Sequence, residues 1–313
     1  MFQGVYEIMK YDLIIVGAGP AGMTAALYAL RAEKSVLLLD GAGYGGQITL
    51  SDCVENYPGI ANVNGYDLAE GMMAQLRPLG IQLENANVTG LEKIENGYKV
   101  LTASKSYEAR AVLLATGVTH RKLGVEGEEK FLGRGVSFCA VCDGGFFRKK
   151  EVAVIGGGNT AVQDALYLSE FCSKVYLIHR REGFRAEERL LEKARKTENI
   201  VFLTDTVVRE MRGEMRLGSL VLKNLKTNEE QELLVSGAFE AIGSIPQNQP
   251  FEAFVPMDRD GYFAIDDNCV APMSGIFVAG DCRAKKIRQL TTATADGTVA
   301  ALAAIEYLDG IVP

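Results

Sequence analysis

The sequence predicts an α/β protein with two doubly wound parallel sheets, the second domain being inserted into the first. The chain has 313 residues, which at roughly 100 to 200 residues per domain suits two domains. A buried strand, a glycine-rich turn and a helix follow one another twice, and a further strand ending in glycine comes late in the chain. Six of the 34 glycines lie in the two turns. Together these features are typical of Rossmann-like dinucleotide-binding domains.

Composition and charge indicate a soluble, mildly acidic globular protein. Apolar residues make up 48% and charged residues 23%, and 33 Lys and Arg against 40 Asp and Glu give a net charge of −7. This balance argues against nucleic acid as the main partner. The uncharged stretch 13–30 is as long as a membrane span, but Gly17, Gly19, Pro20 and Gly22 interrupt it. We therefore expect no signal peptide, no membrane partner and a cytoplasmic location.

The first unit begins with an apolar strand that ends at Val16. The turn Gly17-Ala18-Gly19-Pro20-Ala21-Gly22 follows and matches G-x-G-x-x-G, and it leads into an alanine-rich helix over Met23–Arg31 and a second strand over Val36–Leu39. In this pattern the first glycine permits the tight turn, the second lets a pyrophosphate approach the backbone, and the third allows close helix packing. The helix N-terminus then offers N–H groups to the anion.

The second unit repeats this order. The strand Val152–Ile155 leads into Gly156-Gly157-Gly158-Asn159-Thr160-Ala161, which matches G-x-G-x-x-A, and a helix and the strand Val175–Ile178 follow. One glycine fingerprint alone is weak evidence, but two in complete strand, turn, helix and strand contexts are strong evidence. We expect each unit to hold one dinucleotide.

The residue after each second strand indicates which dinucleotide is bound. Asp40 ends the second strand of the first unit, where a carboxylate can accept hydrogen bonds from a ribose hydroxyl and would repel a 2′-phosphate. The equivalent place in the second unit is His179-Arg180-Arg181-Glu182-Gly183-Phe184-Arg185, whose guanidinium groups can pair with a 2′-phosphate. This favours NADPH over NADH. The alternative is a solvated basic face at the start of a helix over Ala186–Lys196.

A late strand, from Ser274 to Ala279, ends in Gly280-Asp281, and a small-residue helix follows from about Thr292 to Tyr307. An aspartate at the carboxyl end of a parallel strand points into the ligand crevice of a doubly wound sheet. A simple helix N-cap is the alternative role for Asp281.

The late strand also bears on the domain boundaries. The first unit has only its early strands before the second fingerprint begins, so this strand is the candidate that completes its sheet. The second domain is then entered after Ala115-Thr116-Gly117 and left near Ala241-Ile242-Gly243. We expect residues 1–117 and 244–313 to form one domain and residues 118–243 to form the inserted domain.

Cys139 and Cys142 form the one local cysteine pair, followed by Asp143 and Gly144. Two intervening residues suit a small disulfide ring that opens and closes, and Asp143 is placed to shuttle a proton to the thiolate. The alternatives are half of a metal site and two buried structural thiols. Only two histidines are present, so we expect no metal. The single cysteines Cys53, Cys172, Cys269 and Cys282 are expected to be buried small apolar residues.

These motifs together resemble the low-molecular-weight bacterial thioredoxin reductases over essentially the whole chain. The resemblance is carried by 17–22, Gly45-Gly46-Gln47, Glu55-Asn56-Tyr57-Pro58-Gly59, 115–117, Cys139 to Gly144, 156–161, 179–185, Gly280-Asp281 and Arg288-Gln289. It implies an FAD enzyme, usually a homodimer, that uses NADPH to reduce the disulfide of thioredoxin. It also makes Cys142 the cysteine that faces the flavin, Cys139 the one that attacks thioredoxin, and Asp143 the acid/base group.

The resemblance and the fingerprints give two sets of candidate cofactor residues. The FAD set is Gly17, Gly19, Pro20, Ala21, Gly22, Asp40, Gly45, Gly46, Gln47, Asn56, Val88, Ala115, Thr116, Gly117, Gly280, Asp281, Arg288, Gln289 and Leu290. The NADPH set is Gly156, Gly158, Asn159, Thr160, Ala161, His179, Arg180, Arg181, Arg185, Ile242 and Gly243.

The chain departs from the family pattern at three places. It has Gly243-Ser244-Ile245-Pro246-Gln247-Asn248 where Gly-His-x-Pro-Asn-Thr is common, Ala140-Val141 between the cysteines where Ala-Thr is usual, and Cys282 after Asp281. None of these touches the inferred electron path, but they bear on the domain hinge and the flavin environment.

Both the nicotinamide site and the dithiol belong to the inserted domain, yet each must reach one flavin held by the other domain. We therefore expect the inserted domain to rotate between two poses. Rival functions are a flavin dithiol oxidase or a ferredoxin-driven reductase of the same fold, which commonly lack the NADPH motifs. Another rival, the flavoprotein arm of a peroxide-reducing system, needs an extra N-terminal thioredoxin-like module, and a non-catalytic flavin redox sensor would hold FAD without turnover.

Overall fold

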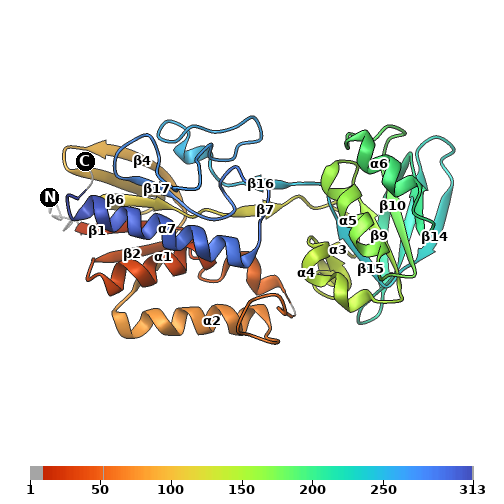
Figure 1. Ribbon diagram of the computed structural model, residues 1–313, viewed down its shortest axis with the longest axis horizontal. Helices are drawn as coiled ribbons and strands as arrows, with labels where there is room; N and C mark the ends of the chain where they lie inside the picture. Colours follow the sequence, from red (N-terminus) through yellow and green to blue (C-terminus); the bar gives the residue numbers. More distant parts are fainter. Residues whose placement is uncertain (1–9, 52, 312–313) are drawn as a thin grey trace, which may run out of the picture. The chain divides into compact units, whose positions relative to one another are not determined.

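The computed structural model describes residues 10–51 and 53–311, which fall into two compact units (Figure 1). Residues up to 51, 57–119 and 245 onward make up the first unit, and residues 52–56 and 120–244 the second. The chain passes from one unit to the other within β7 (Val118–His120) and returns within β16 (Ser244–Pro246). These two strands pair with each other as a two-stranded sheet.

A seven-stranded sheet forms the centre of the first unit, in the order β3-β2-β1-β6-β5-β4 with β17 also paired to β6. Its strands are β1 (Lys10–Val16), β2 (Val36–Asp40), β3 (Gln82–Asn85), β4 (Val88–Ile94), β5 (Gly97–Thr102), β6 (Ser106–Leu114) and β17 (Ile276–Val278). Strands β1, β2, β3, β6 and β17 are parallel, whereas β4 and β5 run antiparallel. The late strand therefore completes the first sheet, as the sequence predicts.

Both faces of this sheet are buried. Leu13 and Ile15 of β1 belong to the core cluster with α1 (Pro20–Arg31), α2 (Gly65–Leu76) and α7 (Leu290–Leu308), whereas Ile14 and Val16 belong to the cluster beneath β4, β5 and η4 (Gln249–Phe251). The short helices η1 (Gly46–Leu50) and η2 (Arg77–Leu79) flank α2. The C-terminal α7 lies beside α1, so both ends of the chain build one unit (Figure 1).

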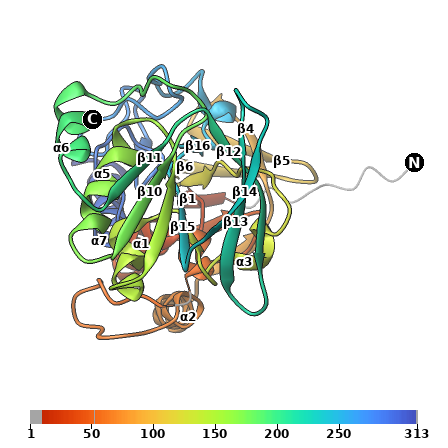
Figure 2. The ribbon, with the colours of Figure 1, turned by 90° about the vertical axis from the view of Figure 1, so that its right-hand side faces the viewer.

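The second unit has a five-stranded parallel sheet in the order β11-β10-β9-β15-β8. Its strands are β8 (Val136–Ser137), β9 (Glu151–Ile155), β10 (Lys174–Ile178), β11 (Ile200–Leu203) and β15 (Gly237–Glu240). Figure 2 shows α5 (Asn159–Ser169) and α6 (Glu188–Arg195) on one side and the antiparallel β12 (Thr206–Gly213), β13 (Leu217–Asn224) and β14 (Glu230–Leu234) on the other. The short helices are α3 (Glu128–Phe131), α4 (Ala140–Asp143) and η3 (Gly144–Phe147). The predicted fold class is confirmed.

Three predicted helix boundaries need correction. The helix expected from Met23 begins at Pro20, because proline suits the first helical position. The helix expected over Ala186–Lys196 is shorter, since α6 begins only after Glu187, whose N–H is held by the Asn159 side chain at 2.8 Å. The helix expected from about Thr292 to Tyr307 is longer and runs over Leu290–Leu308.

Candidate active site

The turn between β1 and α1 has the geometry that its glycines predict. Gly17 has a φ of +105°, and a Cβ on it would lie 2.1 Å from the carbonyl oxygen of Ala115. A Cβ on Gly22 would lie 1.9 Å from the carbonyl oxygen of Gly17. Side chains are therefore excluded at both positions. A Cβ on Gly19 meets no atom within 4 Å, so the middle glycine presents bare backbone to whatever approaches the turn.

Asp40 lies directly beside this turn. Its Oδ2 accepts the N–H of Ala18 at 2.8 Å, and its Oδ1 accepts the N–H of Ala42 at 2.8 Å. Each carboxylate oxygen can accept a second hydrogen bond. Asp40 thus braces the turn and keeps acceptor capacity for a ribose hydroxyl.

The segment with Gly45 and Gly46 closes over the same turn. The N–H of Gly45 donates to the carbonyl oxygen of Ala18 at 2.8 Å, and a Cβ on Gly46 would lie 3.2 Å from Cα of Gly19. Gly19 is also the N-cap of α1, and no side chain caps the first N–H groups of that helix. Pro20 and Ala21, the first two residues of α1, complete a backbone cradle that suits a pyrophosphate.

The ends of β6 and β17 bring further predicted residues to this edge of the sheet. Ala115 donates its N–H to the carbonyl oxygen of Val16 at 2.7 Å, and Thr116 donates its hydroxyl to Asn248 Oδ1 at 2.7 Å. Gly117 follows with a φ of +62°. A Cβ on Gly280 would lie 2.9 Å from the Cβ of Ala21, so β17 ends against the start of α1. The predicted segments 17–22, 115–117 and 280–281 therefore meet at one place.

Asp281 is not a helix N-cap, because Gln289 caps α7. Its Oδ1 is buried and accepts no hydrogen bond, and its closest cation, Nζ of Lys285, lies 3.8 Å away. Burial raises the pKa of this carboxyl above its usual range, although Lys285 and Arg288 oppose the shift. A buried acceptor without a donor is uncommon in folded proteins, so this atom suits a hydroxyl or N–H of a bound group.

Three predicted FAD residues help to build the loop between β17 and α7. Arg288 donates to the carbonyl oxygens of Asp281 and Arg283 at 3.1 Å each, and its guanidinium lies 4.0 Å from the ring centre of Tyr262. Gln289 forms a capping box with Thr292, and Leu290 is the first residue of α7. Arg288 and Gln289 thus stabilise this loop and the start of α7 through their own hydrogen bonds.

The remaining FAD candidates are more scattered. Gln47 lies exposed in η1, next to Gly46. Val88 is half-buried at the start of β4. Asn56 is exposed and belongs to residues 52–56, which count with the second unit rather than with the others.

A buried ionic cluster beneath Gly280 escaped the sequence interpretation. Asp296 of α7 accepts hydrogen bonds from the guanidinium of Arg283 at 3.0 and 3.1 Å, from Lys285 at 2.9 Å and from the Gly280 N–H at 3.0 Å. Arg283 is 2% exposed and Asp296 9%. This cluster holds the loop after β17 in place. An aspartate in the middle of an alanine-rich helix is the signal that could have revealed it.

The second glycine turn repeats the backbone geometry of the first at its outer two glycines, Gly156 and Gly158. A Cβ on Gly156 would lie 2.4 Å from the carbonyl oxygen of Ala241, and a Cβ on Gly158 meets nothing within 4 Å. Gly158 is the N-cap of α5, again without a side-chain cap. A Cβ on Gly157, however, would lie 2.1 Å from Cε1 of His179. His179 thus fills the space that Asp40 occupies in the first unit, and burial lowers the pKa of this imidazole.

The three arginines after β10 lie where the sequence places them, directly beyond the strand end at Ile178. Arg180, Arg181 and Arg185 are exposed, and none forms an ion pair with the described residues. The basic residues of α6 behave differently, because Arg189 pairs with Glu187 at 2.7 Å and Arg195 with Glu188 at 2.6 Å. The free guanidinium groups therefore cluster at the strand end, which favours the 2′-phosphate over a solvated helix face.

Other predicted NADPH residues surround this turn. Asn159 and Thr160 are exposed at the start of α5, and Ala161 is buried against the turn. Ile242 and Gly243 follow β15, and the carbonyl oxygen of Gly243 accepts the N–H of Arg121 at 3.0 Å. These residues share the carboxyl edge of the second sheet.

Cys139 and Cys142 are joined by a disulfide, and both are half-buried. Cys139 is the N-cap of the one-turn helix α4, and its Sγ accepts the N–H of Cys142 at 3.2 Å. The alternative of two buried structural thiols is therefore wrong. Cys172, Cys269 and Cys282 are free thiols and are buried as expected, whereas Cys53 is half-buried.

Asp143 is held beside the disulfide by Ser137. The Ser137 hydroxyl donates to Asp143 Oδ2 and accepts the N–H of Cys139 at 3.0 Å. This buried serine was not singled out from the sequence, because nothing in its local pattern distinguishes it. It links the predicted acid/base group to the predicted attacking cysteine.

Within residues 10–51 and 53–311 no group of three or more His, Cys, Asp and Glu side chains is arranged to hold a metal ion. Over the same residues no helix combines the length and apolar character needed to cross a bilayer.

Comparisons with known proteins agree with this geometry. The family model for pyridine nucleotide-disulphide oxidoreductases matches residues 11–297. The chain belongs to this family. It is 44% identical to the thioredoxin reductase of Treponema pallidum (strain Nichols), over 96% of this chain and 97% of that protein. It is 42% identical to the thioredoxin reductase of Bacillus subtilis (strain 168), over 96% of this chain and 95% of that protein.

Two solved structures of the family are also similar to this chain in fold. The thioredoxin reductase of Streptococcus pyogenes MGAS5005 has 39% identity and a TM-score of 0.93, covering 96% of this chain and 99% of its own. That of Lactococcus lactis, in what is described as an FR conformation, has 41% identity with the same coverages but a TM-score of 0.66. The predicted resemblance, the oxidoreductase class and the cofactors FAD and NADPH are confirmed by these full-length matches.

Proposed function

We propose that this chain is an NADPH-dependent reductase that passes two electrons through FAD to the Cys139–Cys142 disulfide and then to oxidised thioredoxin. The observation that carries the proposal is the half-buried disulfide with Asp143 fixed beside it, in the same unit as a second nucleotide turn. A dithiol oxidase or a ferredoxin-driven reductase would not need that turn or its unpaired arginines.

The FAD domain comprises residues 1–117 and 244–313, and the NADPH domain residues 118–243. The turn at Gly17–Gly22, the carboxylate of Asp40 and the orphaned Oδ1 of Asp281 fit the pyrophosphate, a ribose hydroxyl and a polar group of FAD. The turn at Gly156–Ala161 and the arginines after β10 fit NADPH.

When bound, NADPH supplies a hydride and FAD relays its two electrons. The residues of the chain then perform thiol chemistry. The Cys139–Cys142 bond accepts two electrons and two protons and becomes a dithiol. The Cys139 thiolate attacks one sulfur of the thioredoxin disulfide, and Cys142 resolves the mixed disulfide, so that the bond between Cys139 and Cys142 forms again as thioredoxin leaves as a dithiol. Asp143 holds and returns the proton, and Ser137 orients it.

The surroundings of the disulfide suit a protein partner. Val141, between the two cysteines, is 53% exposed, and Phe146 is 41% exposed. Arg148 and Lys149 follow and are also exposed. Exposed apolar side chains with basic neighbours offer the contact area that a disulfide protein such as thioredoxin needs.

Turnover requires the NADPH domain to rotate about the crossings β7 and β16. The proposal is supported by the solved relatives. The two have nearly equal identity and coverage but TM-scores of 0.93 and 0.66, so their structures match this chain unequally although their sequences match it equally well. Movement of whole domains is one source of such a difference.

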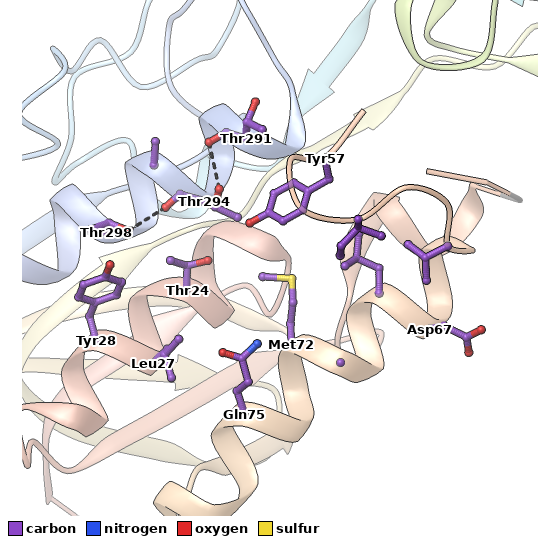
Figure 3. Close-up of a pocket in the computed structure, with 15 residues that line it drawn as sticks. Thr24, Leu27, Tyr28, Tyr57, Asp67, Met72, Gln75, Thr291, Thr294 and Thr298 are labelled. Carbon is purple, nitrogen blue, oxygen red and sulfur yellow. Dashed lines mark hydrogen bonds between the residues drawn. The ribbon is translucent and has the colours of Figure 1, made fainter. Parts of the chain in front are cut away.

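The enzyme works as a homodimer. A groove of about 530 Å³ on the first unit is lined by α1, α2, α7 and the loop with Tyr57, and its walls carry Leu27, Tyr28 and Met72 (Figure 3). On α7 nearby, Val299 and Leu302 are 41% and 47% exposed. Exposed apolar side chains of this extent mark an association surface, and a second copy of the chain is the occupant that the family resemblance favours.

The enzyme acts in the cytoplasm. Cys172, Cys269 and Cys282 are free thiols, as is typical of proteins in a reducing compartment. A disulfide that must be reduced in every cycle also belongs where NADPH is available.

Anaerobic titration tests the electron path. NADPH should bleach the flavin of the purified protein faster than NADH, and oxidised thioredoxin should restore the yellow colour. Cys142→Ser should still be bleached but should reduce no thioredoxin, while Cys172→Ser, the same change at a buried thiol of the same unit, should behave as the parent. Equal bleaching by NADH, or thioredoxin reduction by Cys142→Ser, would contradict the proposal.

A further inference from the structure

Glu240, the last residue of β15, is a buried carboxyl whose oxygens meet no N–H or O–H donor. It is 3% exposed, and neither Oε1 nor Oε2 accepts a hydrogen bond. Burying an ionised carboxylate without compensation costs several kcal/mol, so such groups are paired or protonated. No described cation forms an ion pair with Glu240.

The charged group that interacts most strongly with Glu240 is another buried carboxyl, Glu128, the first residue of α3. Glu128 is 2% exposed, and its oxygens accept the N–H groups of Leu123, Gly124 and Val125 at 3.0, 2.6 and 3.2 Å. Three N–H donors stabilise a charged carboxylate. Glu128 is therefore the hydrogen-bond acceptor of the pair, and a proton on Glu240 can be donated to it.

The charges around this pair agree with one shared proton. Burial, followed by the charge of Glu128, raises the pKa of Glu240 to about 9. The N–H of Leu123 and the distant charge of Lys122 act in the opposite direction. Lys122 is exposed and pairs with Glu129 instead.

The pair lies where the chain enters and leaves the second unit. The loop Leu123–Val125, held by Glu128, follows β7, and Glu240 is followed by the stretch that leads into β16. The N–H of Arg121 donates to the carbonyl oxygen of Gly243 at 3.0 Å, which ties these two stretches together. Glu240 is also paired in register with Ile155, the residue before the Gly156 turn.

We propose that Glu240 is a positioning residue that donates a carboxyl hydrogen bond to Glu128 and thereby fixes the roots of both interdomain crossings. Loss of the proton places two negative charges side by side in the core and loosens the loop Leu123–Val125. The effect on turnover rests on the proposed function, because it acts through rotation about β7 and β16. The shared proton itself does not depend on the proposed function.

Infrared spectroscopy of the full protein tests the proton directly. The parent should show the C=O stretch of a protonated carboxylic acid at pH 7, and this band should disappear with a midpoint near pH 9. Glu240→Gln should lack the band, whereas Glu129→Gln, a change at the exposed neighbour of Glu128, should retain it. A parent without a band that disappears near pH 9, or a band with that midpoint in Glu240→Gln, overturns the shared proton. Burial raises the pKa of Asp164 to about 7, so a band from this carboxyl disappears at lower pH.

Kinetics test the positioning role. Glu240→Gln keeps an N–H donor for Glu128 and cannot ionise, so its thioredoxin reduction at pH 7.5 should stay within about twofold of the parent while its loss of rate above pH 9 is smaller. Glu240→Ala should be slower severalfold in kcat, with the KM for NADPH unchanged. If Glu240→Gln loses rate above pH 9 as the parent does, the positioning role is wrong. If the parent itself fails to reduce thioredoxin, the proposed function fails, while the infrared result still decides the carboxyl pair.

Discussion

The two nucleotide turns share one backbone arrangement, a strand followed by a glycine turn and an uncapped helix, but different side chains lie beside them. In the first unit the residue at the end of the second strand is Asp40, which accepts the N–H of Ala18 at 2.8 Å. In the second unit the corresponding His179 lies against Gly157, where a Cβ would be 2.1 Å from the ring. The residue after the first glycine therefore depends on the residue after the second strand. Alanine is compatible with the carboxylate, whereas the imidazole requires glycine.

The third position of each fingerprint differs for a related reason. Gly17 has a φ of +105°, and its carbonyl oxygen lies where a Cβ on Gly22 would be. Gly156 has a φ of +157°, and the second unit carries Ala161 at that position. The two turns thus differ both in this backbone dihedral and in whether a methyl group fits at the third position. The comparison teaches that the two turns hold similar anions but cannot exchange residues one at a time.

The largest expected effect concerns the difference in charge at the strand ends. The triple variant Arg180→Ala/Arg181→Ala/Arg185→Ala should raise the KM for NADPH about a hundredfold or more, because each lost charge-assisted hydrogen bond is worth about 1.5–3 kcal/mol. The KM for NADH should change little. Steady-state rates with both nucleotides measure this. Arg195→Ala, at an arginine already paired with Glu188, is the control and should leave both KM values unchanged. An equal loss with NADH would mean that the arginines do not select the phosphate.

The next effect compares glycines within the first turn. Gly22→Ala should lower the free energy of unfolding of the FAD-free protein by about 3 kcal/mol, the upper end for overpacking, since its Cβ would lie 1.9 Å from a backbone oxygen. Gly19→Ala should change it by less than about 1 kcal/mol. Denaturant unfolding and the flavin content of the purified variants measure both effects. Gly19→Ala should still lose flavin, so a variant that folds and keeps its full flavin content would contradict the assigned role of Gly19.

A smaller effect tests the dependence between Gly157 and His179. Gly157→Ala should destabilise the protein by about 1–3 kcal/mol through the clash with the imidazole. Adding His179→Asp, which recreates the arrangement of Ala18 with Asp40, should recover at least about 1 kcal/mol. A double-mutant cycle measures this coupling. Strictly additive losses would show that the two positions are independent.

The smallest expected effect is the dependence of stability on pH. The contributions of Asp296 in the first unit and Glu240 in the second should have opposite signs. Hydrogen bonds from Arg283 and Lys285 overcome the effect of burial and hold the pKa of Asp296 below its usual range, so its contribution to stability is present at neutral pH and lost in acid. The pKa of Glu240 is raised to about 9, so the folded protein keeps a proton that the unfolded chain loses near pH 4.5. Between these values Glu240 lowers stability by at most about 1.4 kcal/mol per pH unit.

Melting temperatures from pH 6 to pH 9 check the second slope. Glu240→Gln should melt with a shallower dependence on pH than the parent over this range, and Glu129→Gln should follow the parent. A parent-like slope in Glu240→Gln would place the titration elsewhere.

Much of the site follows from short-range patterns in the sequence. The glycine turns, the late strand that completes the first sheet and the arginines after β10 could be predicted because each is fixed by a local rule of geometry or charge. Pro20 shows the limit of such rules, since the helix starts inside the fingerprint and not after it. The segments 17–22, 115–117 and 280–281 also meet as expected, because the carboxyl ends of parallel strands share one edge.

The other residues of the site could not be predicted, because their roles depend on contacts with side chains that are not part of the same local sequence pattern. Ser137 is an ordinary serine until the fold places it between Cys139 and Asp143. Asp296 lies in a small-residue helix, and only the approach of Arg283 explains it. Glu240 ends a buried strand, and its partner Glu128 lies far away in the sequence. Such pairs arise from long-range packing, which a single sequence does not specify.

The pairing of β17 with β6 has a consequence for how the chain folds. Val278 pairs with Leu114 only after the whole second unit has been made, so the first sheet cannot close early in synthesis. Closing so long a loop is entropically costly and slow. If the second unit folds first, its paired ends at β7 and β16 bring the two halves of the first sheet together. The inserted domain then holds together the two chain segments that form the FAD domain. Destabilising the inserted domain should therefore slow the folding of the FAD domain, even when no residue of the FAD domain is changed.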